Sequence, residues 1–423
     1  MQYKSVGCKI TSAFFKPINQ AKMNILVLNC GSSSIKYQLL SVSGSDDLLA
    51  KGIVDRIGIE GSCLLHKVPN QEDYLVKAEI KNHKTGIGLI LRILTDPEVG
   101  VLNKLEDIEA VGHRVAHGGE TFTEARIIDE DVKKGIRDCF ELAPLHNPAN
   151  YDGIKAMEEL LPGVPQVAVF DTAFHQTMTP DVYLYSLPYD YYERLRVRRY
   201  GFHGTSHKYV AEKACRFLKR DIKKQKIITC HLGNGASITA INGGKSIDTS
   251  MGFTPNEGLM MGTRSGSIDP GALLYIGCHE GMDSNELNNM LNKESGVKGV
   301  SQLSSDMRDL VTAAREGNER ARLALQMYAH RVKQYIGAYA AELNGLDILV
   351  FTGGIGENND YVRDLVCKNL QYMGIIFDDE KNVGLHGQDE IISLPGSHVT
   401  VMTVTTNEEL VIARETYNLV NVE

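Results

Sequence analysis

The sequence predicts an α/β protein in which two related domains face each other across a cleft. Residues 24–36 form a short apolar run that breaks into small polar residues, and residues 227–238 repeat that design. The two copies lie roughly 200 residues apart, a separation typical of duplicated domains. A chain of 423 residues is long enough to build two domains with substantial cores.

The composition excludes several classes of partner. Hydrophobic residues make up 43% and charged residues 23% of the chain, which is typical of a soluble globular protein. The formal net charge of −8 argues against a nucleic-acid partner. No apolar run approaches the roughly 20 residues that span a bilayer, so we expect no membrane partner. The eight cysteines include no Cys-x-x-Cys pair, and as reduced thiols they favour a cytoplasmic location.

Residues 1–22 differ from the rest of the chain. They contain four lysines and no acidic residue, and they end just before Met23. A transit peptide is the alternative interpretation, but such peptides favour arginine and this segment has none. We therefore favour a disordered upstream extension, and we expect a chain that begins at Met23 to keep full activity.

The first apolar run predicts a strand followed by an anion-binding turn. Residues 25–28 read as a buried strand, and residues 32–34 are serines that offer hydroxyl and backbone N–H groups. Lys36 adds a positive charge. These groups suit a polyanion such as a nucleotide phosphate, although an ordinary serine-rich hairpin turn has the same composition.

Two further strands end on charged side chains. Residues 110–119 predict a strand that carries Arg114 into a glycine-rich loop. An arginine so placed suits a bidentate grip on a carboxylate or phosphate, although a surface arginine at a strand end remains the alternative. Residues 166–170 predict a buried strand that ends on Asp171, and open α/β sheets bind ligands at the carboxyl ends of their strands.

His203 and His207 lie four residues apart, just before a helix predicted from about residue 208. A zinc site is excluded because the motif lacks the glutamate of His-Glu-x-x-His and has Gly204 between the two histidines. Contact with an anion, or a hydrogen-bonded position in the core, is the favoured interpretation.

The second stretch repeats the design of the first: an apolar strand, a glycine turn, small residues and a strand again. Superposing the apolar run of residues 227–238 on the first run places His231 on Asn29. Gly244, Lys245 and Ser246 match the end of the P-loop motif, but Thr239 occupies the position of its first glycine. A P-loop is therefore excluded. The later loop, residues 248–271, is rich in glycine, methionine, serine and threonine and contains Arg264.

The C-terminal part adds a third glycine turn and two helices. Residues 318–344 predict a long amphipathic helix, and residues 347–351 predict a strand that opens into the glycine turn 352–358. Glycines there allow a flat ring or ribose to approach the backbone closely. Residues 406–409 resemble a capping box, which places Glu408 in the first turn of the last helix, where a carboxylate can reach a metal.

Taken together, these motifs resemble the acetate/propionate kinase family, of the superfamily of actin, heat-shock chaperones and sugar kinases. The resemblance runs from Met23 to the last helix. It implies two duplicated ribonuclease H-like, actin-like ATPase domains with a cleft between them, over residues 23–172 with 409–423 and over residues 173–408. It also implies a homodimer that uses Mg²⁺, or Mn²⁺, to transfer phosphate reversibly from ATP to acetate, giving acetyl phosphate and ADP.

The same resemblance implies a role for each residue that matches a family motif. These are Asp171, His203 and Arg264 in catalysis; Arg114 on the substrate carboxylate; Ala116, Leu145, Phe202 and Pro255 around the substrate methyl group; Asn29 and Glu408 on the metal; and Lys36, His231, Leu232, Gly233, Asn234, Gly235, Asp306, Met307, Arg308, Gly354, Ile355, Gly356, Glu357 and Asn358 on ATP. A carboxylate substrate is already ionised and needs no base, so we interpret Asp171 as orienting an arginine or a metal-bound water.

Ala116 leaves the choice of substrate open between two carboxylates. The resemblance leads us to expect valine there in acetate-selective members and alanine in propionate-preferring ones. A methylene is worth only about 1–3 kcal/mol of discrimination, so we favour acetate and keep propionate as the alternative. A sugar kinase would need a polar pocket, and a non-catalytic actin-like nucleotide-binding protein would need a large insertion; the sequence shows neither.

Overall fold

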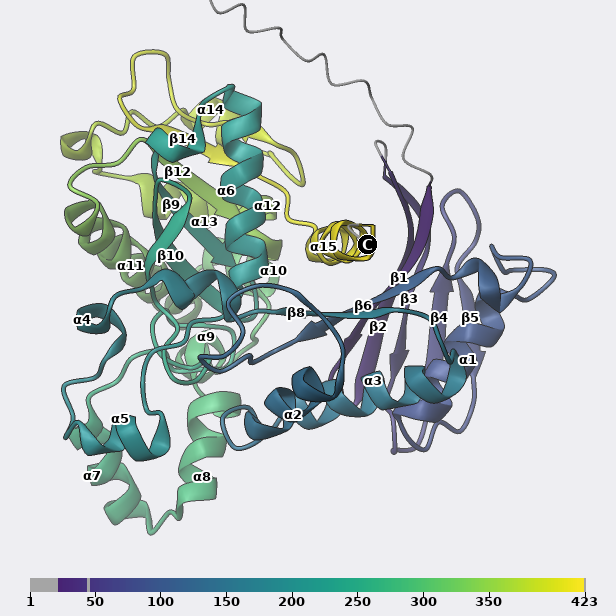
Figure 1. Ribbon diagram of the computed structural model, residues 1–423. Coiled ribbons are helices and arrows are strands. Elements are labelled where there is room, and N and C mark those ends of the chain that lie inside the picture. Colours follow the sequence, from purple (N-terminus) through teal and green to yellow (C-terminus); the bar gives the residue numbers. More distant parts are fainter. Residues whose placement is uncertain (1–21, 44–45, 422–423) are drawn as a thin grey trace, which may run out of the picture.

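The computed structural model describes residues 22–43 and 46–421. The expected disordered extension therefore lies outside the described residues, apart from Lys22, which forms a surface ion pair with Asp47 at 2.8 Å. The protein contains two β-sheets, and Figure 1 shows them on either side of the C-terminal helix α15 (Glu408–Val420).

The first sheet has eight strands and contains the N-terminal motifs. Its strands are β1 (Met23–Cys30), β2 (Ser34–Val42), β3 (Asp47–Asp55), β4 (Cys63–Lys67), β5 (Tyr74–Lys77), β6 (Ala110–Val115), β7 (Arg126–Ile127) and β8 (Gln166–Phe170). They lie in the order β5-β4-β3-β2-β1-β6-β8-β7. β1 is antiparallel to β2 and parallel to β6, and β6 is parallel to β8. The carboxyl ends of β1, β6 and β8 therefore meet at one edge of the sheet.

The second sheet repeats this arrangement with six strands. Its strands are β9 (Lys226–Leu232), β10 (Ala236–Asn242), β11 (Lys245–Thr249), β12 (Ile348–Thr352), β13 (Glu390–Ile391) and β14 (Thr400–Thr403). They lie in the order β11-β10-β9-β12-β14-β13. In the hairpin β1–β2, Asn29 pairs with Lys36, and in the hairpin β9–β10, His231 pairs with Ser237. The two hairpins thus place polar residues at equivalent positions, as the repeat in the sequence predicts.

The described residues form a set of helices, some of which pack against the two sheets. They are α1 (His83–Leu94), α2 (Glu130–Asp138), α3 (Asn147–Leu160), α4 (Pro180–Tyr183), α5 (Asp190–Leu195), α6 (Gly204–Leu218), α7 (Pro270–Glu280), α8 (Ser284–Asn289), α9 (Gly296–Ser301), α10 (Met307–Arg315), α11 (Glu319–Glu342), α12 (Gly353–Asn358), α13 (Asp360–Cys367), α14 (Asp379–Asn382) and α15. In the described part of the chain, none of them combines the length and the apolar character needed to cross a bilayer.

Two helices connect the sheets by crossing between them. α6 comes after the strands of the first sheet but packs its apolar residues against the second sheet. α15 comes after β14 of the second sheet but packs against the first sheet. Gly112 on β6 allows this close approach, because a Cβ there would lie 2.6 Å from the Ile412 side chain. The sheet edges that carry the repeated strand and turn are therefore held next to each other by these two helices.

The starts of both crossing helices differ from the prediction. α6 begins at Gly204, four residues earlier than expected. The capping box expected at residues 406–409 does not form, because Asn407 is the N-cap and accepts a hydrogen bond from the Leu410 N–H. The Thr406 hydroxyl instead hydrogen-bonds with Ser206 of α6 at 3.0 Å, a contact between segments 200 residues apart in sequence.

Candidate active site

An ion pair joins the carboxyl ends of two parallel strands of the first sheet. Arg114 lies on β6, and Asp171 follows β8 directly. The Arg114 Nη2 atom lies 2.5 Å from Asp171 Oδ2, and Arg114 Nη1 donates to Asn29 Oδ1 at 3.5 Å. Because the Asp171 side chain is fully buried, its carboxylate holds the guanidinium at this edge. The three residues that the sequence analysis placed on the substrate, the catalytic step and the metal are thus in contact.

Glu408 brings a further carboxylate to the same edge. Its side chain makes no hydrogen bond to any of the described residues. Burial and the nearby Asp171 carboxylate raise its pKa to about 7, although Arg114 and Lys36 oppose the rise. Asn29 and Glu408 therefore offer oxygen atoms in a place where negative charge is incompletely compensated, and such a place suits a divalent cation.

The loop between β11 and α7 contributes Arg264, and the residue that caps the start of α6 is His203. Arg264 Nη1 donates to the Pro255 carbonyl at 3.1 Å. A Cβ on Gly235 would lie 3.4 Å from Arg264 Nη1 and 3.8 Å from His203 Nε2, so both groups border the turn between β9 and β10. Burial lowers the pKa of His203 well below its usual value, and the positive charges of Arg114 and Arg264 lower it further. The side chains of Arg114, Arg264 and His203 therefore lie close to one another, next to the turn between β9 and β10.

His203 has a left-handed backbone. Its φ of 57° lies in a region that few non-glycine residues adopt, although histidine is enriched there together with asparagine and aspartate. The ring stacks on His231 with 4.3 Å between ring centroids, and Nδ1 hydrogen-bonds with Ser237 at 2.9 Å. These two contacts hold the ring at the start of α6, next to the turn between β9 and β10.

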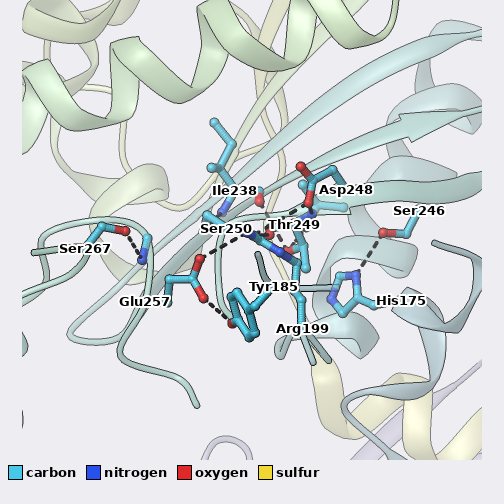
Figure 2. A network of polar contacts seen from close by, with 12 residues as sticks. His175, Tyr185, Arg199, Ile238, Ser246, Asp248, Thr249, Ser250, Glu257 and Ser267 are labelled. Atoms are coloured by element: carbon cyan, nitrogen blue, oxygen red, sulfur yellow. Dashed lines mark hydrogen bonds and ion pairs between the residues drawn. The ribbon is translucent and has the colours of Figure 1, made fainter. Parts of the chain in front are cut away.

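A polar network anchors the loop that carries Arg264. Figure 2 shows Arg199 and Tyr185 converging on the Glu257 carboxylate. Arg199 Nη2 lies 3.0 Å from Glu257 Oε1, and the Tyr185 hydroxyl donates to the other carboxylate oxygen. The same hydroxyl accepts from the Phe253 N–H at 2.8 Å. Pro255 lies between these anchored residues, so the network holds the carbonyl that orients Arg264.

A cavity of about 610 Å³ opens beside the second sheet. Seven of the residues predicted to bind ATP line it, namely Asn234, Asp306, Met307, Arg308, Gly354, Ile355 and Asn358. Asn234 is the neighbour of Gly235, so the cavity adjoins the region that Arg264 and His203 border. A nucleoside in this cavity would extend its phosphates toward that region.

Other predicted ATP residues lie outside this cavity. The Glu357 carboxylate accepts hydrogen bonds from Gly353 N and Thr406 N, both at 2.9 Å, and so ties β12 to the start of α15. Gly356 is buried, and its carbonyl accepts from Arg363. The Leu232 side chain lies in the core, so only its backbone can face a ligand. Lys36 is exposed, and His231 lies with His203 rather than in the cavity.

The four residues predicted around the substrate methyl group differ widely in exposure. Ala116 and Phe202 are buried, at 2% and 5% exposed, whereas Leu145 is 66% exposed. The Ala116 N–H donates to Asn150 Oδ1 at 3.0 Å, which fixes the backbone two residues after Arg114. Pro255 is the residue whose carbonyl holds Arg264. Ala116 and Phe202 thus lie within two residues of Arg114 and His203, and Pro255 contacts Arg264.

The structure also brings in residues that the sequence analysis did not place in the site. Burial lowers the pKa of His146, and so do the charges of Arg114 and Arg264, which places this ring beside both arginines. His386 lines the cavity of about 610 Å³ beside the second sheet. The only local signal for His146 was its position in a loop bounded by prolines, and His386 had none.

Comparison with known proteins settles the family. A model of the Acetokinase family matches residues 24–414. The chain belongs to the acetokinase family. An acetate kinase from Caldicellulosiruptor saccharolyticus is 55% identical over 398 residues, covering 94% of this chain and 99% of that protein.

Solved structures of the acetokinase family agree. The crystal structure of Porphyromonas gingivalis acetate kinase is 50% identical, with a TM-score of 0.92 over 94% of this chain and 100% of that chain. A propionate kinase from Francisella tularensis is 42% identical, with a TM-score of 0.87 over 94% and 99% of the two chains. These likenesses confirm the predicted fold class of two actin-like, ribonuclease H-like domains, and family membership implies ATP as the co-substrate.

Proposed function

We propose that this protein catalyses the reversible transfer of the ATP γ-phosphate to acetate, giving acetyl phosphate and ADP. One observation carries the proposal: Arg114 on β6, His203 at the start of α6 and Arg264 in the loop after β11 surround one region, next to the cavity of about 610 Å³. An attacking carboxylate and a nucleotide are both anions, so bringing them together requires positive charge from both sides.

The reaction needs electrostatic stabilisation rather than proton transfer. Acetate is ionised at pH 7 and attacks without a base. Phosphoryl transfer then depends mainly on positioning and on stabilising charge on the phosphoryl oxygens. Arg114 binds the acetate carboxylate, and Arg264 and His203 face the transferred group. Asp171 holds the Arg114 guanidinium, and its contact at 2.5 Å supports an orienting role.

Magnesium fits the same edge of the first sheet. Asn29 and Glu408 would hold the ion, and Glu408 has no hydrogen-bond partner of its own among the described residues. The described part of the chain contains no cluster of three or more histidine, cysteine or acidic side chains that could hold a metal. A site with few protein ligands suits Mg²⁺, because this ion keeps water molecules and substrate phosphate oxygens among its ligands. When bound, it supplies charge neutralisation at the phosphates; Mn²⁺ has compatible ligand preferences.

Acetate is the favoured substrate, and propionate is not. Relatives that are 53–55% identical are named acetate kinases, whereas the propionate kinase structure is 42% identical. The small Ala116 side chain leaves room for an extra methylene, so propionate is expected as a poorer substrate. Comparing kcat/KM for acetate, propionate and butyrate tests this order, and a preference for propionate would reverse it.

We also propose a cytoplasmic homodimer that associates through α7. Ten of the eleven residues of this helix are not buried, although it is rich in apolar residues. Leu274 and Tyr275 are 67% and 63% exposed. A surface of this kind marks an interface, and a second copy would cover it by two-fold symmetry. The seven cysteines among the described residues are free thiols, which supports a reducing compartment.

The lobe boundaries that we propose follow the crossing helices. One lobe comprises residues 23–172 with 409–423, supported by the packing of α15 on the first sheet. The other comprises residues 173–408, supported by the packing of α6 on the second sheet. The cleft between the lobes then contains the site.

An acyl-hydroxamate assay with ATP, Mg²⁺ and acetate tests the activity directly. Replacing Arg114 or Arg264 with alanine should cost about 3 kcal/mol or more of transition-state stabilisation, as for a lost oxyanion donor. Arg126→Ala, at an exposed position on β7, is the control and should keep the normal rate. No hydroxamate from the folded protein would favour a sugar kinase or a non-catalytic nucleotide-binding protein instead.

A further inference from the structure

Three buried side chains and the half-buried His203 form a continuous series of hydrogen bonds that ends at His203. The Thr229 hydroxyl lies 2.7 Å from His207 Nδ1, and His207 Nε2 lies 2.7 Å from the Ser237 hydroxyl. The same Ser237 hydroxyl lies 2.9 Å from His203 Nδ1. Thr229, Ser237 and His207 are fully buried, so no water competes for these contacts.

The hydrogen atoms in this series of hydrogen bonds can be arranged in only two ways. Burial lowers the pKa of both histidines well below the usual value, so each ring is neutral and has one N–H and one acceptor nitrogen. Ser237 has one hydroxyl hydrogen and two histidine partners, so it donates to one ring and accepts from the other. All hydrogens therefore run toward His203, or all run away from it.

Thr229 decides the direction. Among the described residues, its hydroxyl contacts only His207. If the hydrogens ran away from His203, Thr229 would accept from His207, and its own hydrogen would be buried without a partner. An unpaired buried donor costs about 1–3 kcal/mol, whereas an unused lone pair is tolerated more readily. Thr229 therefore donates to His207, His207 donates to Ser237, and Ser237 donates to His203 Nδ1.

We propose that Thr229, His207 and Ser237 are positioning residues that hold His203 as the tautomer with its hydrogen on Nε2. That nitrogen makes no hydrogen bond to any described residue and borders Gly235 together with Arg264 Nη1. Its N–H is therefore directed at the region assigned to the transferred phosphoryl group. The catalytic meaning of this inference rests on the proposed function.

The opposite tautomer would work against the reaction. It would present the Nε2 lone pair to the phosphoryl oxygens, which carry negative charge. With the N–H outward, His203 donates a hydrogen bond without itself carrying a charge. A preset donor of this kind needs no reorganisation when charge develops on the phosphoryl group.

Nuclear magnetic resonance of protein with ring-¹⁵N histidine tests the tautomer itself. The His203 signals are assigned by their loss in His203→Gln. Couplings from the ring protons should identify Nδ1 as the unprotonated nitrogen and Nε2 as the protonated one. A protonated Nδ1 in the wild-type protein overturns the proposal. This readout does not use acetate, so it stands apart from any failure of the proposed function.

Variants of the hydrogen-bonded residues test whether they position His203. Ser237→Ala and Thr229→Val should lower kcat about tenfold or more, with the larger loss for Ser237→Ala, and change KM less than about twofold. In both variants the His203 spectrum should show a mixture of tautomers. The controls are Ser246→Ala and Thr239→Val, which remove buried hydroxyls bonded to His175 and Thr249. They should keep the wild-type kcat and the wild-type His203 spectrum.

Two results would contradict the positioning role. One is a wild-type His203 tautomer in Ser237→Ala with an unchanged kcat. The other is an equal loss of kcat in the controls, which would show that any missing buried hydroxyl has the same effect. If Ser237→Ala does not fold, Thr229→Val and the wild-type spectrum still decide the question, because valine has nearly the shape of threonine.

Discussion

Replacing Glu408 with glutamine should stabilise the protein and inactivate it at the same time. Glu408 is held next to Asp171 at the first turn of α15, and its pKa is raised from 4.5 to about 7. The folded state therefore disfavours the carboxylate that the unfolded chain carries freely. Glutamine has nearly the same shape and no charge, so it removes this cost together with one proposed magnesium ligand.

The size of the effect follows from the pKa. Below the unfolded value of 4.5 both states are protonated, and Glu408 costs nothing. As the pH rises, the unfolded chain ionises first, and the cost grows until the folded carboxyl also ionises near pH 7. The free energy of unfolding of Glu408→Gln should exceed that of the wild type by about 3 kcal/mol at pH 8 and by less than about 1 kcal/mol at pH 5.

Urea unfolding of both proteins at several pH values, with EDTA present, measures this difference. With ADP present throughout, adding Mg²⁺ should stabilise the wild type and have little effect on Glu408→Gln. Glu415→Gln is the matched control, because this residue lies on the same helix but forms an ion pair with Lys208 at 2.8 Å. It should show no gain at pH 8. A Glu408→Gln protein that is equally stable at all pH values, or that keeps full Mg²⁺-dependent activity, would refute the reasoning.

Three further predictions concern the substrate pocket, the Arg264 loop and the dimer. Ala116→Val should raise the ratio of kcat/KM for acetate over propionate about tenfold, and an unchanged ratio would remove Ala116 from the pocket. Glu257→Gln weakens the anchor of the Arg264 loop, so kcat should fall and the free energy of unfolding should drop by about 1–3 kcal/mol; a normal kcat would contradict this link. Leu274→Lys should convert a dimer to a monomer in light scattering, and a persistent dimer would exclude α7 as the interface.

Local patterns in the sequence predicted the main elements well. The apolar runs at residues 25–28 and 227–232 are buried strands, and the long helix expected at residues 318–344 is α11, capped by Asn318. These features depend on side-chain periodicity and capping within a few residues. The repeat of strand and turn likewise predicted a duplicated fold, because two similar local patterns build similar hairpins.

The composition of the site could be predicted in part. Arg114 and Asp171 were each placed at the carboxyl end of a strand, and parallel strands bring such ends together. Their direct contact depends on the order of β6 and β8 in the sheet. Likewise, seven predicted ATP residues share one cavity, whereas Glu357 is used to tie β12 to α15.

Only the tertiary structure decided how the two halves are joined and how His203 is held. Thr406 has the sequence of a capping residue, but Ser206 and Glu357 from other elements take its hydroxyl and its N–H, so Asn407 caps α15 instead. The chain from Thr229 to His203 likewise runs across β9, α6 and β10. Helix and strand patterns are set by neighbours within a few residues, whereas hydrogen bonds between buried side chains depend on which distant segments the crossing of α6 and α15 brings together.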